Sequence, residues 1–560
     1  MGALTVRSTP GIWLLDYHVG GRVFRYATER CSVTDAAGTT YLYDEGLSDL
    51  ELGMVRTLGE RRIGIEVNSP EDWAIHIARG TGLDQRRAVL RYWRSGTVLE
   101  RADVVAVGLT EGVAVSDGGE ALSFEIVDDL AARALTLPPP SAVVGDDTWP
   151  SGRAGYELPD DSVGKLYPVL IGYPGDHPKR GASVDLAEPA FPAALVEEQT
   201  VGDSAERWLV AHGRIEAAQA SLWLDEGSGL ESSDQATAVT TDLLGQTLTY
   251  VEVGNLAPTS TEVWAGLRKA SGWGGGILSP YTGDVLRGAG EVARYILDYF
   301  APTVTLDKGR MAAAQAWLDR FQVDGVILGE NAVTWLDERV LRHLPVMGVD
   351  GPRGFYLAPM RWDAQARHAV AHLDADTGRV DLDGEIGTWD EPVFNHFVLD
   401  YRPRRMGAEY ASRRTLTSID GDLTAAITTG ANLPPFTTSL PWIATTERDY
   451  RVWGSVLCRG SQARHGVRQM DTIQHMACWD DHTAALILHY LAARYAVPKR
   501  QARYVGGAEL DGLLPGDVVT VTDTANYLSS AVALVVERTV SAADVALDLV
   551  LLGVEGRRVT

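Results

Sequence analysis

Alternating apolar and polar residues dominate about the first 135 positions, and this two-residue period predicts β-strands. The stretch RVFRYATERCSVTDAAGTTYLYDE has the pattern of a strand, a glycine-containing turn and a second strand. ADVVAVGLTEGVAVSDGGEALSFEIVDD repeats it, with turns expected at Gly112 and Gly118-Gly119. Short strands at this spacing are typical of a sandwich or barrel. The run Pro138–Pro140 favours stiff, extended backbone and marks a boundary.

A second β region follows, and at about residue 266 the apolar period changes from two residues to that of a helix. The β region contains KLYPVLIGYPGD, RWLVAHGRI, ASLWLDE and QTLTYVEV. The first helical face consists of Val285, Leu286, Ala289, Val292, Ile296 and Phe300, and Pro302 ends it. A second helix is expected from an Asp307 N-cap to Phe321. A third starts after Asn331, carries Trp335, Leu336, Val340 and Leu344 on one face, and ends at Pro345.

The remaining third of the chain mixes both periods. GFYLAPMRW and the following residues predict strands joined by a turn at Asp376-Thr377-Gly378, and DYRVWGSVLCRG and TIQHMACWD also predict strands. A helix is expected from Asp481 to Tyr495. In LLPGDVVTVTD, Pro515-Gly516 suits the centre of a type II turn, and Val519 and Val521 share one face of the next strand. AVALVVERTV and VALDLVLLGV then complete a β-meander.

These patterns predict a multidomain, mainly β protein with several barrels or sandwiches around an α+β insert. We divide the chain into an N-terminal β domain (1–137) and a second β domain (141–265). An α+β insert with three helices and a hairpin covers 266–405, and a mixed domain ending in a meander or barrel covers 406–560.

Composition narrows the functional classes. The 560 residues are 45% hydrophobic and carry a net charge of −25, which argues against a nucleic-acid-binding surface. No apolar run is long enough for a membrane helix, and Pro10 and Asp16 interrupt any signal-peptide core, so we expect synthesis in the cytoplasm. Cys31, Cys458 and Cys478 are too few for a disulfide framework.

The charge is uneven along the chain. Residues 183–254 hold 13 acidic residues against Arg207 and Arg214, whereas residues 401–414 hold five arginines and one glutamate. Two interpretations stay open, a solvated surface of both signs and complementary patches between subunits or partners.

Candidate chemistry is sparse. The glycine-rich stretch from Gly272 to Pro280 matches neither a dinucleotide fingerprint nor a P-loop. The segment Asp374–Glu385 is acidic, but Arg379 stands where a calcium loop needs glycine, so a hairpin strand is favoured. His475, Cys478, His482 and His489 could form a zinc site. However, an N-cap at Asp480-Asp481 would place His475 and Cys478 on a strand and the other two on a helix. We therefore expect no enzyme activity, no cofactor and no resident metal.

The order of the segments resembles one family. LLPGDVVTVTD, with AALILHYLAARYAVPKRQARYVGGAEL before it and LDLVLLGV after it, resembles the C-terminal part of tailed-phage baseplate hub proteins. The helical stretch VLRGAGEVARYILDYFAPTVTLDKGRMAAAQAWLDRF, followed by GFYLAPMRW, looks like the insert of that family. GKLYPVLIGYPGD is similar to the start of a β domain in siphophage tail-tip hubs. Together these segments cover about residues 160–560.

The resemblance implies a structural virion protein at the tail tip or baseplate. Such hubs are homotrimers whose two barrel-like domains per subunit approximate six-fold symmetry on a distal tail protein or tail tube ring. Their channel passes the tape-measure protein and then DNA, and other tail-tip or fibre proteins attach around them. Within this resemblance, Pro515, Gly516 and Asp517 form a structural turn rather than a catalytic site.

Two alternatives stay open. A tail protein that binds carbohydrate or degrades cell wall would expose an aromatic platform or a cleft with paired carboxylates. The burial of five tryptophans distinguishes this class from the hub: Trp93, Trp149, Trp223, Trp273 and Trp362. A metal-dependent protein would use the region from His475 to His489.

Overall fold

The computed structural model describes most of residues 11–552. The longer segments that it leaves undescribed are 1–10, 69–72, 117–120, 131–133, 138–143, 145–155, 174–190, 200–205, 226–229, 254–261, 405–408, 418–446, 541–544 and 553–560, with gaps of one or two residues elsewhere. The expected turn at Gly118-Gly119 and the boundary at Pro138–Pro140 lie outside the described residues.

The N-terminal strands form a closed barrel, as the alternating pattern predicts. Its elements are β1 (Gly11–Val19), β2 (Arg22–Ala27), β3 (Cys31–Thr34), β4 (Thr40–Glu45), β7 (Glu60–Asn68), α1 (Trp73–Ala78), β8 (Arg87–Arg94), η1 (Leu99–Arg101), β9 (Asp103–Val115) and β10 (Ala121–Asp129). The sheet order runs β3-β4-β2-β1-β8-β9-β10-β7. A bridge between Leu47 and Val67 joins β7 to the segment after β4, so the sheet closes on itself.

Two local features of this barrel differ from expectation. Gly112 lies inside β9 with a φ of 64°, beside a register shift against β10, so it marks a β-bulge rather than a turn. The short helix α1 was not predicted. Its Trp73 is fully buried against the rings of Tyr17 and Phe24, which makes it part of the barrel core.

The second β region also closes into a barrel. Its elements are β12 (Tyr156–Glu157), η2 (Asp160–Ser162), β14 (Phe191–Pro192), β15 (Ala194–Gln199), β16 (Glu206–His212), β17 (Gln219–Asp225), β18 (Leu230–Leu243), β19 (Gln246–Val253), β20 (Glu262–Lys269) and β21 (Gly272–Trp273). The order is β12-β15-β16-β19-β18-β17-β20-β14. β14 pairs with β20 at one end of this order, and β15 pairs with β16 near the other end. Only Ala193 separates β14 from β15, so this continuous segment joins the two ends of the sheet and closes it.

The helical insert occupies the middle of the molecule. It contains β22 (Gly325–Ile327), β23 (Glu330–Asn331), β24 (Val346–Gly351), β25 (Gly354–Pro359), α2 (Ala289–Phe300), α3 (Lys308–Leu318), α4 (Ala332–Trp335) and its π-helical continuation η3 (Leu336–Leu341). Asp307 caps α3 and Asn331 caps α4, as predicted. Helix α2 begins at Ala289, after the first two residues of its predicted apolar face. Those residues, Val285 and Leu286, lie in the preceding loop, where Val285 forms an isolated β-bridge with Leu278.

Short strands join this insert to both β regions. β11 (Thr136–Leu137) pairs with β23, β13 (Val169–Ile171) pairs with β22, and β6 (Val55–Arg56) pairs with β24. Segments far apart in sequence are therefore connected by backbone hydrogen bonds.

A further helical layer follows the insert. α6 (Glu447–His465) and α7 (Asp481–Tyr495) pack together beside a sheet of β29 (Phe397–Arg404), β30 (Glu409–Leu416) and β31 (Ile473–Gln474). The strand predicted for DYRVWGSVLCRG is wrong, since these residues form α6. Leu457, Cys458 and Ser461 are buried at helical spacing against α7 and the sheet, so packing outweighs the β propensity of the valines.

The C-terminal meander is confirmed, and it belongs to a third large sheet. That sheet contains β26 (Ala371–Asp374), β27 (Val380–Leu382), β28 (Gly387–Thr388), β32 (Arg500–Gly506), β33 (Val518–Asp523), β34 (Leu528–Val540), β35 (Val545–Leu551) and β5 (Leu52–Gly53). Val519 and Val521 are fully buried, and Thr520 and Thr522 on the opposite face are half-buried, as predicted.

The expected hairpin around Gly378 is wrong. β26 pairs with β33 and β27 pairs with β32, at opposite edges of the order β26-β33-β34-β35-β32-β27. The short turn η5 (Ala375–Thr377) and Gly378, with a φ of 67°, connect these edges. Six flat strands would separate them by about 24 Å, more than a few residues can span, so the sheet curls into an open barrel.

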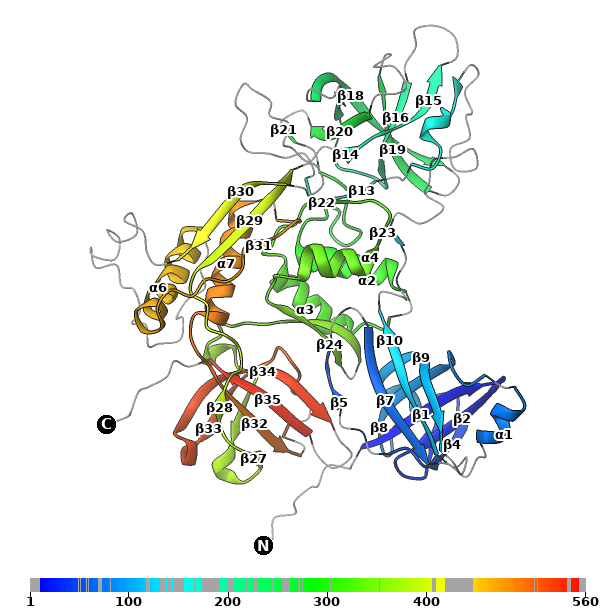
Figure 1. Ribbon diagram of the computed structural model, residues 1–560, viewed down its shortest axis with the longest axis vertical. Helices are drawn as coiled ribbons and strands as arrows, with labels where there is room; N and C mark the ends of the chain where they lie inside the picture. The colour runs from blue at the N-terminus through cyan, green and yellow to red at the C-terminus, as the bar shows by residue number, and fades with distance from the viewer. Residues whose placement is uncertain are drawn as a thin grey trace.

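The N-terminal barrel and the C-terminal open barrel lie side by side at one end of the molecule, with the helical insert above them (Figure 1). The second barrel lies at the opposite end (Figure 1). The protein is thus mainly β, with several barrels around a helical insert, as predicted.

Candidate functional site

The turn at Leu514–Asp517 lies where the C-terminal barrel meets the helical insert. Gly516 has a φ of 91°, and the Asp517 amide donates to the Leu514 carbonyl at 3.0 Å, as in a type II turn. The Gly516 amide donates to the carbonyl of Val535, and the Val535 amide donates back to the Asp517 carbonyl, both at 2.9 Å. The turn is therefore joined to β34.

Side chains of the insert hold the other side of this turn. The Arg310 guanidinium on α3 donates both Nη atoms to the Asp517 carboxylate, at 3.0 and 3.1 Å. The Tyr356 hydroxyl on β25 donates to the Pro515 carbonyl at 3.0 Å. The Arg310 guanidinium also lies over the Tyr356 ring, 5.2 Å from its centroid.

The electrostatics of these groups favour a fixed contact. Burial of Arg310 opposes its charge, but the hydrogen bonds and charge of Asp517 outweigh burial and raise the pKa of Arg310. Burial also raises the pKa of Tyr356 far above its usual range. Asp517 additionally accepts from the Leu514 amide at 2.9 Å. A carboxylate with these partners fixes the turn against α3.

The N-terminal barrel reaches the same junction through residues 52–56. Strand β5 pairs with β34, and β6 pairs with β24 of the insert. The Glu537 carboxylate on β34 accepts from the amides of Met54 and Val55, at 2.6 and 3.1 Å. Burial raises the pKa of Glu537, and these amide hydrogen bonds oppose that shift. One side chain thus satisfies two backbone donors of another domain.

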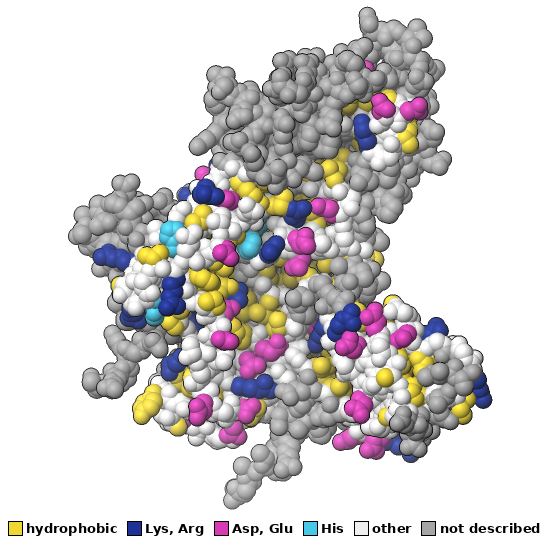
Figure 2. Space-filling view, in the orientation of Figure 1, with side chains coloured by type: hydrophobic (Ala, Val, Ile, Leu, Met, Phe, Trp, Pro, Cys, Tyr) yellow, Lys and Arg dark blue, Asp and Glu magenta, His cyan; other side chains and the backbone are white. Residues whose placement is uncertain are grey.

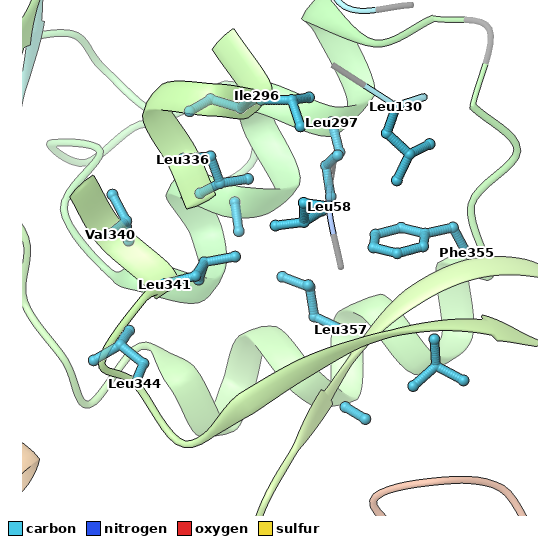
Figure 3. Close-up of a cluster of buried hydrophobic side chains, with 14 of the residues drawn as sticks. Leu58, Leu130, Ile296, Leu297, Leu336, Val340, Leu341, Leu344, Phe355 and Leu357 are labelled. Carbon is cyan, nitrogen blue, oxygen red and sulfur yellow. The ribbon is translucent and has the colours of Figure 1, made fainter. Parts of the chain in front are cut away.

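An ion pair and a shared apolar core complete the junction. Arg61 of β7 pairs with Asp350 of β24 at 2.5 Å, and both side chains are about nine-tenths buried. Leu58, just before β7, and Leu130, just after β10, lie among apolar side chains of α2, η3 and β25 (Figure 3). One apolar cluster therefore spans the barrel and the insert.

Residues 275–279 of the glycine-rich stretch pack against protein rather than forming an open loop. A Cβ at Gly276 would lie 2.3 Å from the Leu170 carbonyl oxygen, so only glycine allows this close approach. The Gly275 amide donates to Glu216 at 2.8 Å. Ser279 accepts from the amides of Tyr281 and Thr282, which organises the loop before α2.

Carboxylates of the acidic segment Asp374–Glu385 each contact different neighbouring groups. Asp374 accepts from the Asp376 amide, and Asp376 accepts from the amide and hydroxyl of Thr524. Asp383 pairs with Arg503 at 3.3 Å. These carboxylates point to different partners.

The four residues considered for zinc are spread over different elements. Asp480 caps α7 by accepting from the Thr483 amide, which places His482 and His489 on the helix and leaves His475 and Cys478 before it. Burial lowers the pKa of His475 to about 3, and the ring lies 6.0 Å from that of His343. Within the part of the chain that the structure describes, no group of three or more His, Cys, Asp or Glu could hold a metal ion.

Described arginines of the basic segment 401–414 pair internally. Arg413 donates two hydrogen bonds to Asp400, at 2.6 and 2.8 Å, and Arg402 pairs with Asp481 at 3.3 Å. Arg414 donates to the Asp481 carbonyl. Side chains of both charges are interspersed over the described part of the face in Figure 2.

The tryptophans give no aromatic platform where their side chains are described. Trp93 and Trp362 are 5% and 6% exposed, respectively. Trp149 and the side chains of Trp223 and Trp273 lie outside the described residues. No helix in the described ranges is long and apolar enough to span a membrane.

Sequence reasoning missed Arg310, Tyr356 and Glu537. Arg310 and Asp517 are separated by 207 positions, and Glu537 and Met54 by 483. No local pattern signals a partner at such a distance, so only the folded chain reveals these contacts.

No protein-family model matches the chain, and no curated protein matches it. Among solved structures, it is similar to the 43 kDa tail protein of prophage MuSo2 from Shewanella oneidensis, at 8% identity and a TM-score of 0.33, covering 97% of each chain. It is also similar to chains of two phage P2 baseplate structures in the activated conformation, each at 10% identity and a TM-score of 0.15. These matches cover 74% of this chain and 98% of the other. Likenesses this distant do not establish a common fold.

Proposed function

We propose that this protein is a structural hub at the distal end of a phage tail tube, built as a homotrimer. The proposal rests on the order of hub-like segments in the sequence and on one structural observation. The N-terminal and C-terminal barrels lie side by side and are joined directly through β5 and Glu537, and the Arg61–Asp350 pair joins the N-terminal barrel to the helical insert.

Two barrels held side by side suit a ring. Three copies that each contribute two barrels place six such units around an axis, which approximates the symmetry of a hexameric tail ring. A ring of this kind needs a constant angle between the two barrels of each copy. The junction supplies it through backbone pairing, buried polar contacts and a continuous apolar core rather than a flexible linker.

The proposed partners follow from this position. The face formed by the barrels would contact a distal tail protein or the tail tube ring, and other tail-tip or fibre proteins would attach to the outer domains. The channel would pass the tape-measure protein and then DNA. Three copies carry 3 × −25 = −75 charges in total, and a negative channel wall would repel phosphate and prevent sticking. A strongly basic wall in an imaged assembly would contradict this account of passage.

Mass photometry and electron microscopy of the purified chain, alone and with its tail ring, test the proposal. We expect three-fold particles with six peripheral lobes. Cross-linking of mixed isotope-labelled and unlabelled copies should connect residues 11–130 of one copy with residues 371–551 of another. A stable monomer that never joins a tail ring would rule out the hub.

The competing carbohydrate-binding function gains no support from the described tryptophans, since Trp93 and Trp362 are buried in the core. Glycan-array binding by the monomer would favour it over the hub.

A further inference from the structure

One edge of the sheet beside α7 borders a groove. The sheet has the order β30-β29-β31, so β31 is an edge strand, and it lies on the side of β29 that faces the helical insert (Figure 1). The groove has a volume of about 400 Å³ and runs along the six consecutive residues 469–474. Its other side is lined by Arg342 and His343, at the end of η3, and by Phe394.

Half of the backbone groups of this edge point away from β29. Ile473 pairs with β29, and the His475 amide donates to the Asp400 carbonyl of that strand at 2.9 Å. Backbone groups of successive residues in a strand point in opposite directions, so those of Thr472 and Gln474 point into the groove. Among the residues that the structure describes, no backbone group pairs with Thr472 or Gln474 on that side.

The side chains that line the groove suit an extended peptide. Phe394 and Met470 are half-buried apolar side chains that pack against the core and also face the groove. Arg342 and Asp471 are exposed, and neither forms an ion pair with a described residue. An unpaired strand edge offers alternating donors and acceptors, which another extended backbone matches along its length.

We propose that this groove binds an extended segment of a partner protein, which adds a strand to the sheet beside β31. Backbone groups of Thr472 and Gln474 pair with the segment, and one of its apolar side chains lies against Met470 and Phe394. Its own acidic and basic side chains pair with the two exposed charges of the groove. Because the end of η3 lines the other side, there is room for a single strand rather than for the edge of a second folded copy. The site is independent of the hub function.

Hydrogen exchange distinguishes a free edge from an occupied one. In the free protein, the amides of Thr472 and Gln474 should exchange without protection, whereas the His475 amide is protected by its hydrogen bond to Asp400. A bound segment should protect the first two amides as well. Exchange mass spectrometry with fragmentation to single residues measures all three amides on the full chain.

The probe is a short synthetic peptide selected by mRNA display on the full chain, with counter-selection on the Gln474→Pro variant. Proline removes the outward N–H at this position and leaves the hydrogen bond between His475 and Asp400 in place. We expect the selected peptide to protect the amides of Thr472 and Gln474. It should bind about 10-fold more weakly to the Arg342→Gln variant, which loses one ion pair with the peptide.

N-methylation of the peptide tests backbone pairing directly. An edge strand pairs with every second amide of its partner, so methylating one alternate set should abolish binding and methylating the other set should preserve it. The matched control variant is Arg379→Gln, which changes an exposed arginine on the connection between β26 and β27 and should leave binding unchanged.

Failure to select any peptide, equal weakening by both arginine variants, or binding that survives methylation of either set would overturn the proposal. Protection of Thr472 and Gln474 that rises with protein concentration, in the absence of peptide, would also overturn it by assigning the edge to a second copy. The methylated peptides are measured on the unmodified protein, so the outcome stands even if the Gln474→Pro variant does not fold.

Discussion

Gly516 is the residue at which one added methyl group should have the clearest structural cost. Its φ of 91° disfavours any L side chain, and a Cβ would lie 2.9 Å from the Cβ of Ala358 on β25. Gly512 has a similar φ of 88°, but a Cβ added there would have no neighbouring atom within 4 Å.

The Gly516→Ala variant should therefore lose stability through both strain and overpacking, whereas Gly512→Ala loses it through strain alone. We expect Gly516→Ala to unfold with a free energy about 1–3 kcal/mol lower than Gly512→Ala. Chemical denaturation of the two variants measures the difference. Equal destabilisation would mean that the turn moves away from β25 without cost.

His475 should make the protein sensitive to acid. Its folded-state pKa is about 3, because burial disfavours the charged ring, whereas the unfolded chain takes up the proton near pH 6.5. Between these values the unfolded state holds more protons, so stability falls as the pH is lowered from about 6.5 towards 3. The half-buried His343, with a folded-state pKa of about 4 because desolvation disfavours its charged ring, adds a slope of the same sign.

The His475→Phe variant removes this titration while keeping an aromatic ring of similar size. Its stability should fall less steeply between pH 7 and 5 than that of the unmodified protein, as measured by denaturation at each pH. His372, which is exposed on β26, provides the control variant His372→Phe. If both variants keep the original slope, the acid sensitivity comes from other groups.

Strand β5 shows how one short element connects two domains. It contributes two residue pairs to β34, and the Glu537 carboxylate adds hydrogen bonds to the next two amides, Met54 and Val55. Truncating Glu537 leaves the half-buried Val55 amide without its acceptor, whereas the Met54 amide keeps its hydrogen bond to the Arg538 carbonyl at 3.0 Å. The lost acceptor costs roughly 1–3 kcal/mol.

We expect Glu537→Ala to increase hydrogen exchange in residues 52–56 and along the paired part of β34, before any change in the distant second barrel. Exchange mass spectrometry of the variant measures this directly. The exposed Glu385→Ala change, on the loop before β28, should leave all these amides protected. Unchanged protection in Glu537→Ala would show that strand pairing alone holds the junction.

Elements were predictable where a local signal was strong. Asp307, Asn331 and Asp480 cap their helices as their side-chain chemistry predicts, and α7 spans Asp481–Tyr495 as expected. Helix α6 was mistaken for a strand, because the valines of DYRVWGSVLCRG favour β structure locally. Its helical period appears only in which residues are buried: Leu457, Cys458 and Ser461 face elements distant in sequence.

For the whole molecule, charge should oppose assembly. Each copy carries a net charge of −25, so neighbouring copies repel at long range unless salt screens them. We expect the trimeric fraction of the proposed hub to rise as sodium chloride is increased from low to physiological concentration. Sedimentation velocity across a salt series measures the fraction. A trimer that dissociates on adding salt would instead indicate an interface dominated by complementary ion pairs.

The linear order of residues was enough to show a mainly β protein with a helical insert, because strand and helix periods and caps are properties of neighbouring residues. It also defined the turn at Pro515-Gly516, since proline and glycine restrict φ locally. Only the tertiary structure decided that β26 and β27 lie at opposite edges of one sheet. It also decided that Asp517 meets Arg310, and that β5 completes the sheet of another domain. These contacts join residues up to 483 positions apart, and their partners are selected by packing of the whole chain rather than by any local preference.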